Sequence, residues 1–174
     1  MTRTAEQLQL SVEDGDIHPS ETASNGIISR IAFLPPPVDW CEEEERRRVF
    51  WNIFLMDRFC SISTGWNLSL TSADARRRLP CEGSLWEAGH RLEHPTPYFG
   101  LSDQTGSAGC ALPDIRPESQ DQNALGGFAY AIEATESLSL VTSFFLQQTV
   151  DISRPQQVQV WLMRFKQLDL RLVQ

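Results

Sequence analysis

The four cysteines and three histidines of this 174-residue chain are the side chains best suited to hold a metal. The cysteines lie about twenty to thirty residues apart, at Cys41, Cys60, Cys81 and Cys110. None of them forms a Cys-x-x-Cys or Cys/His pair at zinc spacing, and no secretory leader precedes them, so we expect free thiols. His90 and His94 are four residues apart, but Pro95 and the lack of a third ligand argue against a metal site.

Two glutamates three residues apart, Glu133 and Glu136, are the nearest approach to a pair of catalytic carboxylates. Acids at this spacing on a helix usually face water, and we expect that here. The sequence contains no glycine-rich phosphate loop, nucleophile elbow, His-Glu-x-x-His motif or Ser/His/Asp combination. We therefore expect no catalytic residue, no cofactor and no enzymatic activity in this chain.

The charge balance argues against direct contact with nucleic acid. The formal net charge is −8 and the isoelectric point is about 4.8, whereas DNA-binding domains usually present a basic field. The one basic run, Arg76 to Arg78, is shorter than a usual nuclear-localisation or DNA-binding patch and has acids nearby. A solvated or ion-paired surface is the favoured interpretation. No run approaches the roughly 18 apolar residues of a membrane span, so we expect no membrane contact.

One helix is expected to position the rest of the chain, over about residues 42–63. Glu42, Glu43 and Glu44 each precede an arginine by four residues, which predicts a solvent-facing first turn. From Val49 onward, apolar residues point in almost every direction around the axis, so this helix should be buried on several sides. Gly65 ends it as the left-handed residue after the last turn.

Two charges, Asp57 and Arg58, fall in the most apolar part of this helix and need partners from elsewhere. We expect Asp74 or Glu82 to pair with Arg58, and backbone N–H groups of residues 65–70 to bind Asp57.

The remaining segments predict an all-α fold, an irregular multi-helix domain around the central helix. Residues 1–25 read as a polar, disordered lead, and residues 89–123 as a long loop that is flexible at about 100–122, with residues 98–99 docking on the core. Helices are expected over about 123–148 and from Ser153 onward. The first should pack on the central helix through a stripe at seven-residue spacing: Ala131, Ala134, Leu138, Val141 and Phe145.

The order and spacing of these residues resemble the middle homology (regulatory) region of fungal zinc binuclear cluster transcription factors. The likeness covers roughly residues 34–174 and continues through residues 96–100, 127–138 and 164–172. The positions that carry it most specifically are Arg46, Arg47, Arg48, Trp51, Asp57, Arg58, Gly65, Asp74, Leu79, Pro80 and Trp86.

The resemblance implies that residues 26–174 form a helical regulatory and interaction domain of a nuclear factor that controls RNA polymerase II transcription. The C-terminal helix pattern is still running at Gln174, which reads as an incomplete domain truncated at its C-terminus. In such proteins DNA is read by a separate six-cysteine cluster that holds two zinc ions, and no residue here matches it. The implied partners are other proteins, the factor's own DNA-binding region, a small-molecule effector, or a second copy forming a homodimer. A stand-alone helical small-molecule-binding or enzymatic domain is the alternative.

Overall fold

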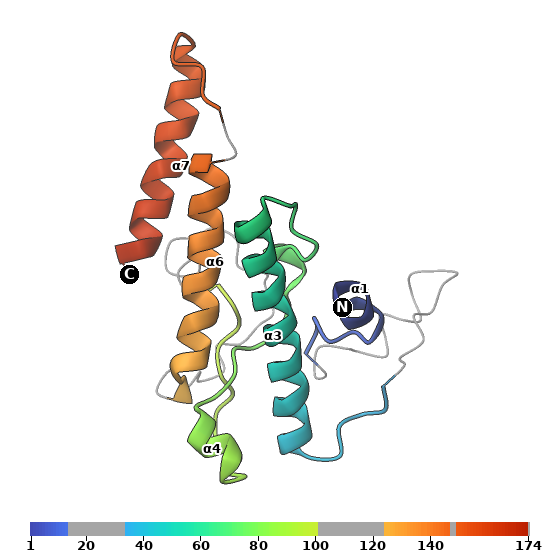
Figure 1. Cartoon of the computed structure of the whole chain (residues 1–174). Helices are drawn as coiled ribbons and strands as arrows, with labels where there is room; N and C mark the ends of the chain where they lie inside the picture. Colours follow the sequence, from blue (N-terminus) through green and yellow to red (C-terminus); the bar gives the residue numbers. More distant parts are fainter. Residues whose placement is uncertain (14–33, 101–123, 147–148, 174) are drawn as a thin grey trace, which may run out of the picture.

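The computed structural model describes residues 1–13, 34–100, 124–146 and 149–173, and it confirms the all-α prediction (Figure 1). Its helices are α1 (Thr2–Gln7), α3 (Trp40–Thr64), the short 3-10 helix η2 (Ser72–Asp74), α4 (Gly83–Glu87), α6 (Gly127–Leu146) and α7 (Pro155–Val173). Between them, the described segments meet in isolated β-bridges rather than in a sheet. None of the helices in the described ranges is long and apolar enough to cross a membrane.

The central helix α3 lies between α6 on one side and α1 on the other (Figure 1). It begins close to the predicted position because the Asp39 side chain accepts the Glu42 N–H at 2.8 Å, and Glu42 in turn accepts the Val38 N–H. It ends as predicted at Gly65, whose φ of 71° is left-handed. Both ends of the longest helix are therefore set by local sequence.

Aromatic side chains form the core around the middle of α3. Phe50, Trp51 and Phe54 are almost completely buried. The Phe99 ring lies 5.0 Å from Trp51 and 5.3 Å from Phe54, in tilted and edge-on arrangements that favour aromatic pairs. The predicted docking of this segment on the core is thus confirmed for Phe99. Leu70, Leu79 and Ile132 complete the same apolar cluster.

The N-terminal segment differs from the disordered lead that we expected over residues 1–25. Residues 1–13 are ordered: α1 packs against α3, and Ala5 and Leu10 join the core. Glu13, at the end of this segment, is also buried. The prediction was wrong there because few apolar residues are needed when charged contacts anchor the segment as well. Residues 14–25, the loop at 101–122 and Cys110 lie outside the described residues.

Helix α6 packs on α3, as expected, but through a different face. It turns Ala129, Ile132, Glu136 and Ser139 inward, and all four are buried. Most of the predicted stripe faces solvent instead, namely Ala131, Ala134, Leu138 and Phe145. Apolar residues lie on both sides of this helix, so the seven-residue spacing alone did not identify the inward side.

Replacing Gly65 by alanine should lower the free energy of unfolding by about 1–2 kcal/mol, because a Cβ disfavours the left-handed backbone at this position. No atom lies within 4 Å of the Cβ position at Gly65, so the cost is conformational rather than steric. Gly127→Ala is the matched control. The Cβ position at Gly127 is as open as that at Gly65, but Gly127 is helical, so alanine should be neutral or stabilising there. Urea titrations measure both. Equal effects of the two substitutions would contradict the role given to Gly65.

Candidate functional site

The charged residues of α3 that carry part of the family resemblance lie in two clusters of largely buried charges, one towards each end of the helix: Arg47, Arg48, Asp57 and Arg58. We call Glu13, Glu44, Arg47, Arg48 and Arg77 the N-terminal charge cluster, and Asp57, Arg58 and Glu136 the C-terminal charge cluster. Three of these side chains, Glu44, Arg47 and Arg58, belong to α3 and are at most 5% exposed. Ionised groups at this depth require fixed partners, because their loss of hydration is otherwise strongly unfavourable.

Arg47 is the centre of the N-terminal charge cluster. Its guanidinium forms ion pairs with Glu13 and Glu44, and a third with Glu43 at 3.0 Å. The predicted solvent-facing first turn is therefore wrong for Glu44 and Arg47. It is right for Glu42, which stays partly exposed and pairs with Arg46 at 2.6 Å. The pattern of four-residue spacings identified these pairs but not their burial, which depends on Glu13 from another segment.

Arg48 connects α3 to the chain around Cys81 and to α4. Its guanidinium binds Glu44 at 3.1 Å, donates to the Cys81 carbonyl oxygen at 2.8 Å, and lies 4.5 Å from the centre of the Trp86 ring. Glu44 also accepts the Cys81 N–H at 2.9 Å. Burial and the Glu44 carboxylate raise the pKa of the Cys81 thiol to about 11, so this thiol stays protonated. Cys41 and Cys60 are free as well, as predicted.

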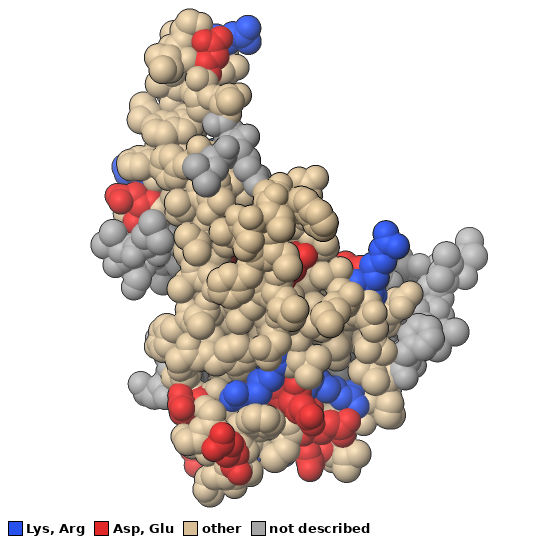
Figure 2. All heavy atoms as spheres, viewed as in Figure 1, with Lys and Arg blue, Asp and Glu red and all other residues tan. Residues whose placement is uncertain are grey.

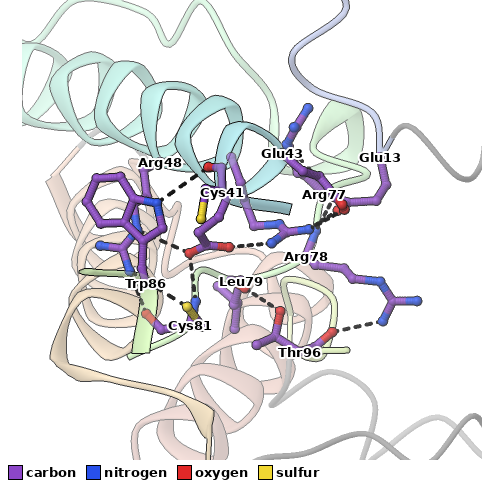
Figure 3. A network of polar contacts seen from close by, with 12 residues as sticks. Glu13, Cys41, Glu43, Arg48, Arg77, Arg78, Leu79, Cys81, Trp86 and Thr96 are labelled. Carbon is purple, nitrogen blue, oxygen red and sulfur yellow. Dashed lines mark hydrogen bonds and ion pairs between the residues drawn. The ribbon is translucent and has the colours of Figure 1, made fainter. Parts of the chain in front are cut away.

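Arg77 joins the N-terminal segment to the chain before Leu79 (Figure 3). It is 1% exposed, donates to the carbonyl oxygens of Leu10 and Val12 at 2.8 Å, and lies 3.8 Å from the Glu13 carboxylate. The solvated or ion-paired surface expected for Arg76 to Arg78 is wrong for Arg77, which is ion-paired but buried, whereas Arg76 is exposed and Arg78 is half-buried. Arg78 donates to the Thr96 carbonyl oxygen, and its guanidinium lies 4.3 Å from the centre of the Tyr98 ring.

Glu13 is held ionised by this cluster. Burial by itself would raise the pKa of its carboxyl, but the Arg47 and Arg77 guanidiniums and the Arg78 N–H lower that pKa below its ordinary value of 4.5. Burial would likewise lower the pKa of Arg47, but the facing glutamates raise it above its usual value. Both groups are thus charged when the segment is in place, and each stabilises the other.

Arg58 is the centre of the C-terminal charge cluster and is fully buried. Its Nε lies 2.7 Å from a Glu136 carboxylate oxygen, and it donates to the Leu70 carbonyl oxygen at 2.6 Å and to the Ser72 hydroxyl at 3.2 Å. Of the two acids expected for this role, Glu82 was the wrong one, because Arg58 binds Glu136. The side chain of Asp74, a residue of η2, lies outside the described part of the structure. Glu136 comes from α6, so this ion pair joins the two longest helices.

Asp57 binds the backbone of the loop after α3, as predicted. Its carboxylate accepts the N–H groups of Ser69 and Leu70, each at 3.0 Å. Because Arg58 binds the Leu70 carbonyl oxygen, adjacent charges on α3 fix both polar groups of one loop residue. The loop therefore has a defined path back to the core.

Further family-motif residues contribute to this framework. Trp51 donates its indole N–H to the Arg78 carbonyl oxygen at 2.8 Å, and Leu79 and Pro80 are buried. A cavity of about 360 Å³ lies beside α7, lined by residues that include Val150, Gln156 and Trp161. None of the motif residues lines it.

The predicted carboxylate pair also serves this framework. Glu133 accepts the Gly100 N–H at 2.8 Å, whereas Glu136 binds Arg58, so the expectation that both simply face water was wrong. Among the described residues, no group of three His, Cys, Asp or Glu side chains could hold a metal ion. Sequence reasoning missed Glu13 and Glu136 as anchors, since both are separated by long stretches of chain from the arginines that they bind.

Arg58→Ala should lower the free energy of unfolding by about 3–5 kcal/mol, because it leaves the buried Glu136 carboxylate without its charged partner. Glu43→Ala should lower the free energy of unfolding by only about 0.3–0.5 kcal/mol, because Glu43 is partly exposed and pairs with Arg47, four residues along the same helix. Denaturant titrations of both variants test this. Equally mild effects would show that Arg58 is hydrated and that α3 is not buried on several sides.

Glu13→Gln should make the free energy of unfolding depend less on pH in the acidic range. A carboxylate with a lowered folded-state pKa stabilises the fold above its ordinary pKa of 4.5, and this contribution disappears as the pH falls through the lowered value. The variant should be less stable than the wild type at about pH 7, and the difference should shrink towards about pH 3. Unfolding titrations across this range measure it, and a difference that does not change with pH would contradict the assignment.

Comparisons with known proteins agree with the family that these residues indicated. The model of the "Fungal specific transcription factor domain" family matches residues 1–108, more than half of the chain. No solved structure matches the chain significantly.

Three curated relatives are transcription regulators. A tropolone cluster transcription factor of Talaromyces stipitatus is 40% identical over 57 residues, which are 33% of this chain and 10% of that protein. A pigment biosynthesis transcriptional activator of Monascus ruber is 36% identical over 52 residues, which are 30% of this chain and 9% of that protein. Sorbicillinoid biosynthetic cluster transcription factor 1 of Penicillium rubens is 30% identical over 116 residues, and the match covers 62% of this chain and 18% of that protein. The chain thus matches less than a fifth of each relative's length. With more than half of its residues matched by the family model, the chain belongs to the fungal-specific transcription factor domain family.

Proposed function

We propose that this chain is the regulatory and interaction domain of a nuclear factor that controls RNA polymerase II transcription of a fungal biosynthetic gene cluster. The family match supports the regulatory role. The three relatives support the narrower target, because each is named for a tropolone, sorbicillinoid or pigment pathway. One structural observation carries the proposal: buried family-motif residues, among them Arg47, Trp51 and Arg58, hold the helices and loops of this domain together.

DNA recognition is assigned by this proposal to a separate part of the factor, with zinc held there by a cysteine cluster. The net charge of −8 is unfavourable for contact with phosphates, and the described cysteines are far from zinc-ligand spacing. The domain would then act through proteins, through the DNA-binding part of its own factor, or through a small-molecule effector. The relatives are named as transcription regulators rather than enzymes, which supports a non-catalytic domain over the enzymatic alternative.

A reporter assay tests the regulatory role. The whole chain is fused to a heterologous DNA-binding domain that lacks regulatory activity, and expression of a reporter with the matching sites is measured in a fungal host. The wild-type fusion and the Glu43→Ala fusion should both change reporter output, whereas Arg58→Ala should abolish the change because its framework is broken.

Immunoblots at matched abundance separate loss of regulation from loss of protein. A wild-type fusion that is present in the nucleus at this abundance and leaves the reporter unchanged would count against the proposal. Specific binding of duplex DNA by the unfused chain, measured by gel-shift titration, would contradict the assignment of DNA recognition elsewhere.

A further inference from the structure

The N-terminal segment, residues 1–13, contains little that would order it by itself. Helix α1 has six residues, too few for a helix to be stable alone in water. The following Gln9 adopts a left-handed backbone with a φ of 57°, which is unfavourable for a residue with a Cβ. The segment nevertheless packs beside α3 (Figure 1), so contacts with the rest of the domain must hold it there.

The end of this segment is attached as a strand would be. Val12 forms a parallel bridge with Arg76, and the Glu13 N–H donates to the Arg76 carbonyl oxygen at 3.1 Å. The Arg77 guanidinium adds hydrogen bonds to the carbonyl oxygens of Leu10 and Val12, both at 2.8 Å. These contacts use the main chain of the segment, so an extended peptide of almost any sequence can form them.

Two kinds of side chain give this attachment its specificity. Ala5 and Leu10 are buried in the apolar cluster around α3. Glu13, three residues after Leu10, accepts the Arg78 N–H at 3.2 Å, where a second strand would supply a carbonyl oxygen. Its carboxylate also forms an ion pair with Arg47 of α3. An aliphatic residue followed three positions later by an acid is therefore the pattern that fits this site.

The receiving side of the contact is held in place by other parts of the chain. Residues 77–79 pair with residues 97–99, on the edge opposite to the one that the N-terminal segment covers. The Trp51 indole donates to the same stretch of chain at 2.8 Å. Arg47 has a further ion pair with Glu43, on its own helix, at 3.0 Å. Departure of the N-terminal segment would thus expose a strand edge that is already positioned beside an arginine.

The acid is recognised at the covered arginines and not by the surface around them. Over the N-terminal end of α3, exposed acidic and basic side chains lie side by side (Figure 2), so this view shows no basic field that would attract an acid from a distance. Arg47, by contrast, is 5% exposed, and its Nε–H has no hydrogen-bond partner among the described residues. The site therefore offers a further donor to an acidic side chain.

We propose that this edge is a peptide-binding site that residues 10–13 occupy as an internal ligand, and that a segment of a partner protein with the same two anchors displaces them. The partner segment is extended and carries an aliphatic residue three positions before an aspartate or glutamate. Displacement is a local unfolding of residues 1–13 and does not involve the C-terminal charge cluster. The domain thereby has a contact that stays covered until a partner competes for it, whichever genes the factor controls.

A synthetic peptide of residues 1–13 is the probe, and fluorescence anisotropy measures its binding to the whole chain. The fluorophore is attached at Met1, which is 82% exposed. A tethered segment competes at an effective concentration of about millimolar, so the free peptide should bind the wild-type chain only weakly. Weakening the internal ligand should therefore strengthen binding of the peptide.

Glu13→Gln in the chain should lower the dissociation constant of the peptide at least about tenfold, because the internal acid no longer competes for Arg47. Glu6→Gln is the matched control: Glu6 is exposed on α1, so the same loss of charge should leave the constant unchanged. Glu13→Gln in the peptide should raise the constant at least about tenfold on the same chain.

Hydrogen exchange measured by mass spectrometry shows where the peptide binds. An isotope-labelled peptide should remove protection from the chain's own residues 2–10, whose place it takes. Circular dichroism establishes that each variant is folded. If the Glu13→Gln chain does not fold, Leu10→Ala replaces it, because that change weakens the other anchor.

Three results would overturn the proposal. The first is a folded Glu13→Gln chain that does not bind the peptide up to roughly 1 mM. The second is binding that leaves residues 2–10 protected, since the peptide would then lie elsewhere. The third is binding that Glu13→Gln in the peptide does not weaken, since the acid would then not be an anchor.

Discussion

The burial of ionised side chains on α3 is the constraint on which the rest of the structure depends. Moving a charged group out of water costs several kcal/mol unless a partner and further hydrogen bonds replace the lost hydration. Arg47 and Arg58 meet this requirement with Glu13 from the N-terminal segment and Glu136 from α6. These partners must be present for α3 to be buried. Ion pairs therefore help to position the N-terminal segment and α6 against α3, in addition to apolar contacts.

Between the two charge clusters, apolar contacts contribute most of the stability, and polar contacts determine where each segment lies against α3. The rings of Phe50, Trp51 and Phe54 can pack against many apolar neighbours with similar energy. The indole N–H of Trp51 has one buried acceptor, the Arg78 carbonyl oxygen, which sets the chain before Leu79 against α3. From there the Thr96 hydroxyl donates to the Leu79 carbonyl oxygen, and the following residues bring Phe99 onto the same rings.

Most of what the sequence predicted depends on short-range spacing, and most of what it missed depends on distant contacts. The extent of α3, its end at Gly65 and the binding of Asp57 to the following loop all depend on neighbouring residues. Glu13 precedes Arg47 by 34 residues and Glu136 follows Arg58 by 78, so periodicity carries no information about either pair. The side of α6 that faces α3 was missed for the same reason. Apolar residues occur on both sides of this helix, and it is the ion pair of Glu136 with Arg58 that turns one side towards α3.

The placement of the family-motif residues also limits how such a domain can regulate. Arg47, Arg58 and Trp51 are buried and engaged with other parts of the chain, so they cannot contact a partner without unfolding the framework. Their contacts hold this fold together. As long as those contacts are intact, any partner of this domain would therefore meet exposed residues of the fold rather than these three side chains.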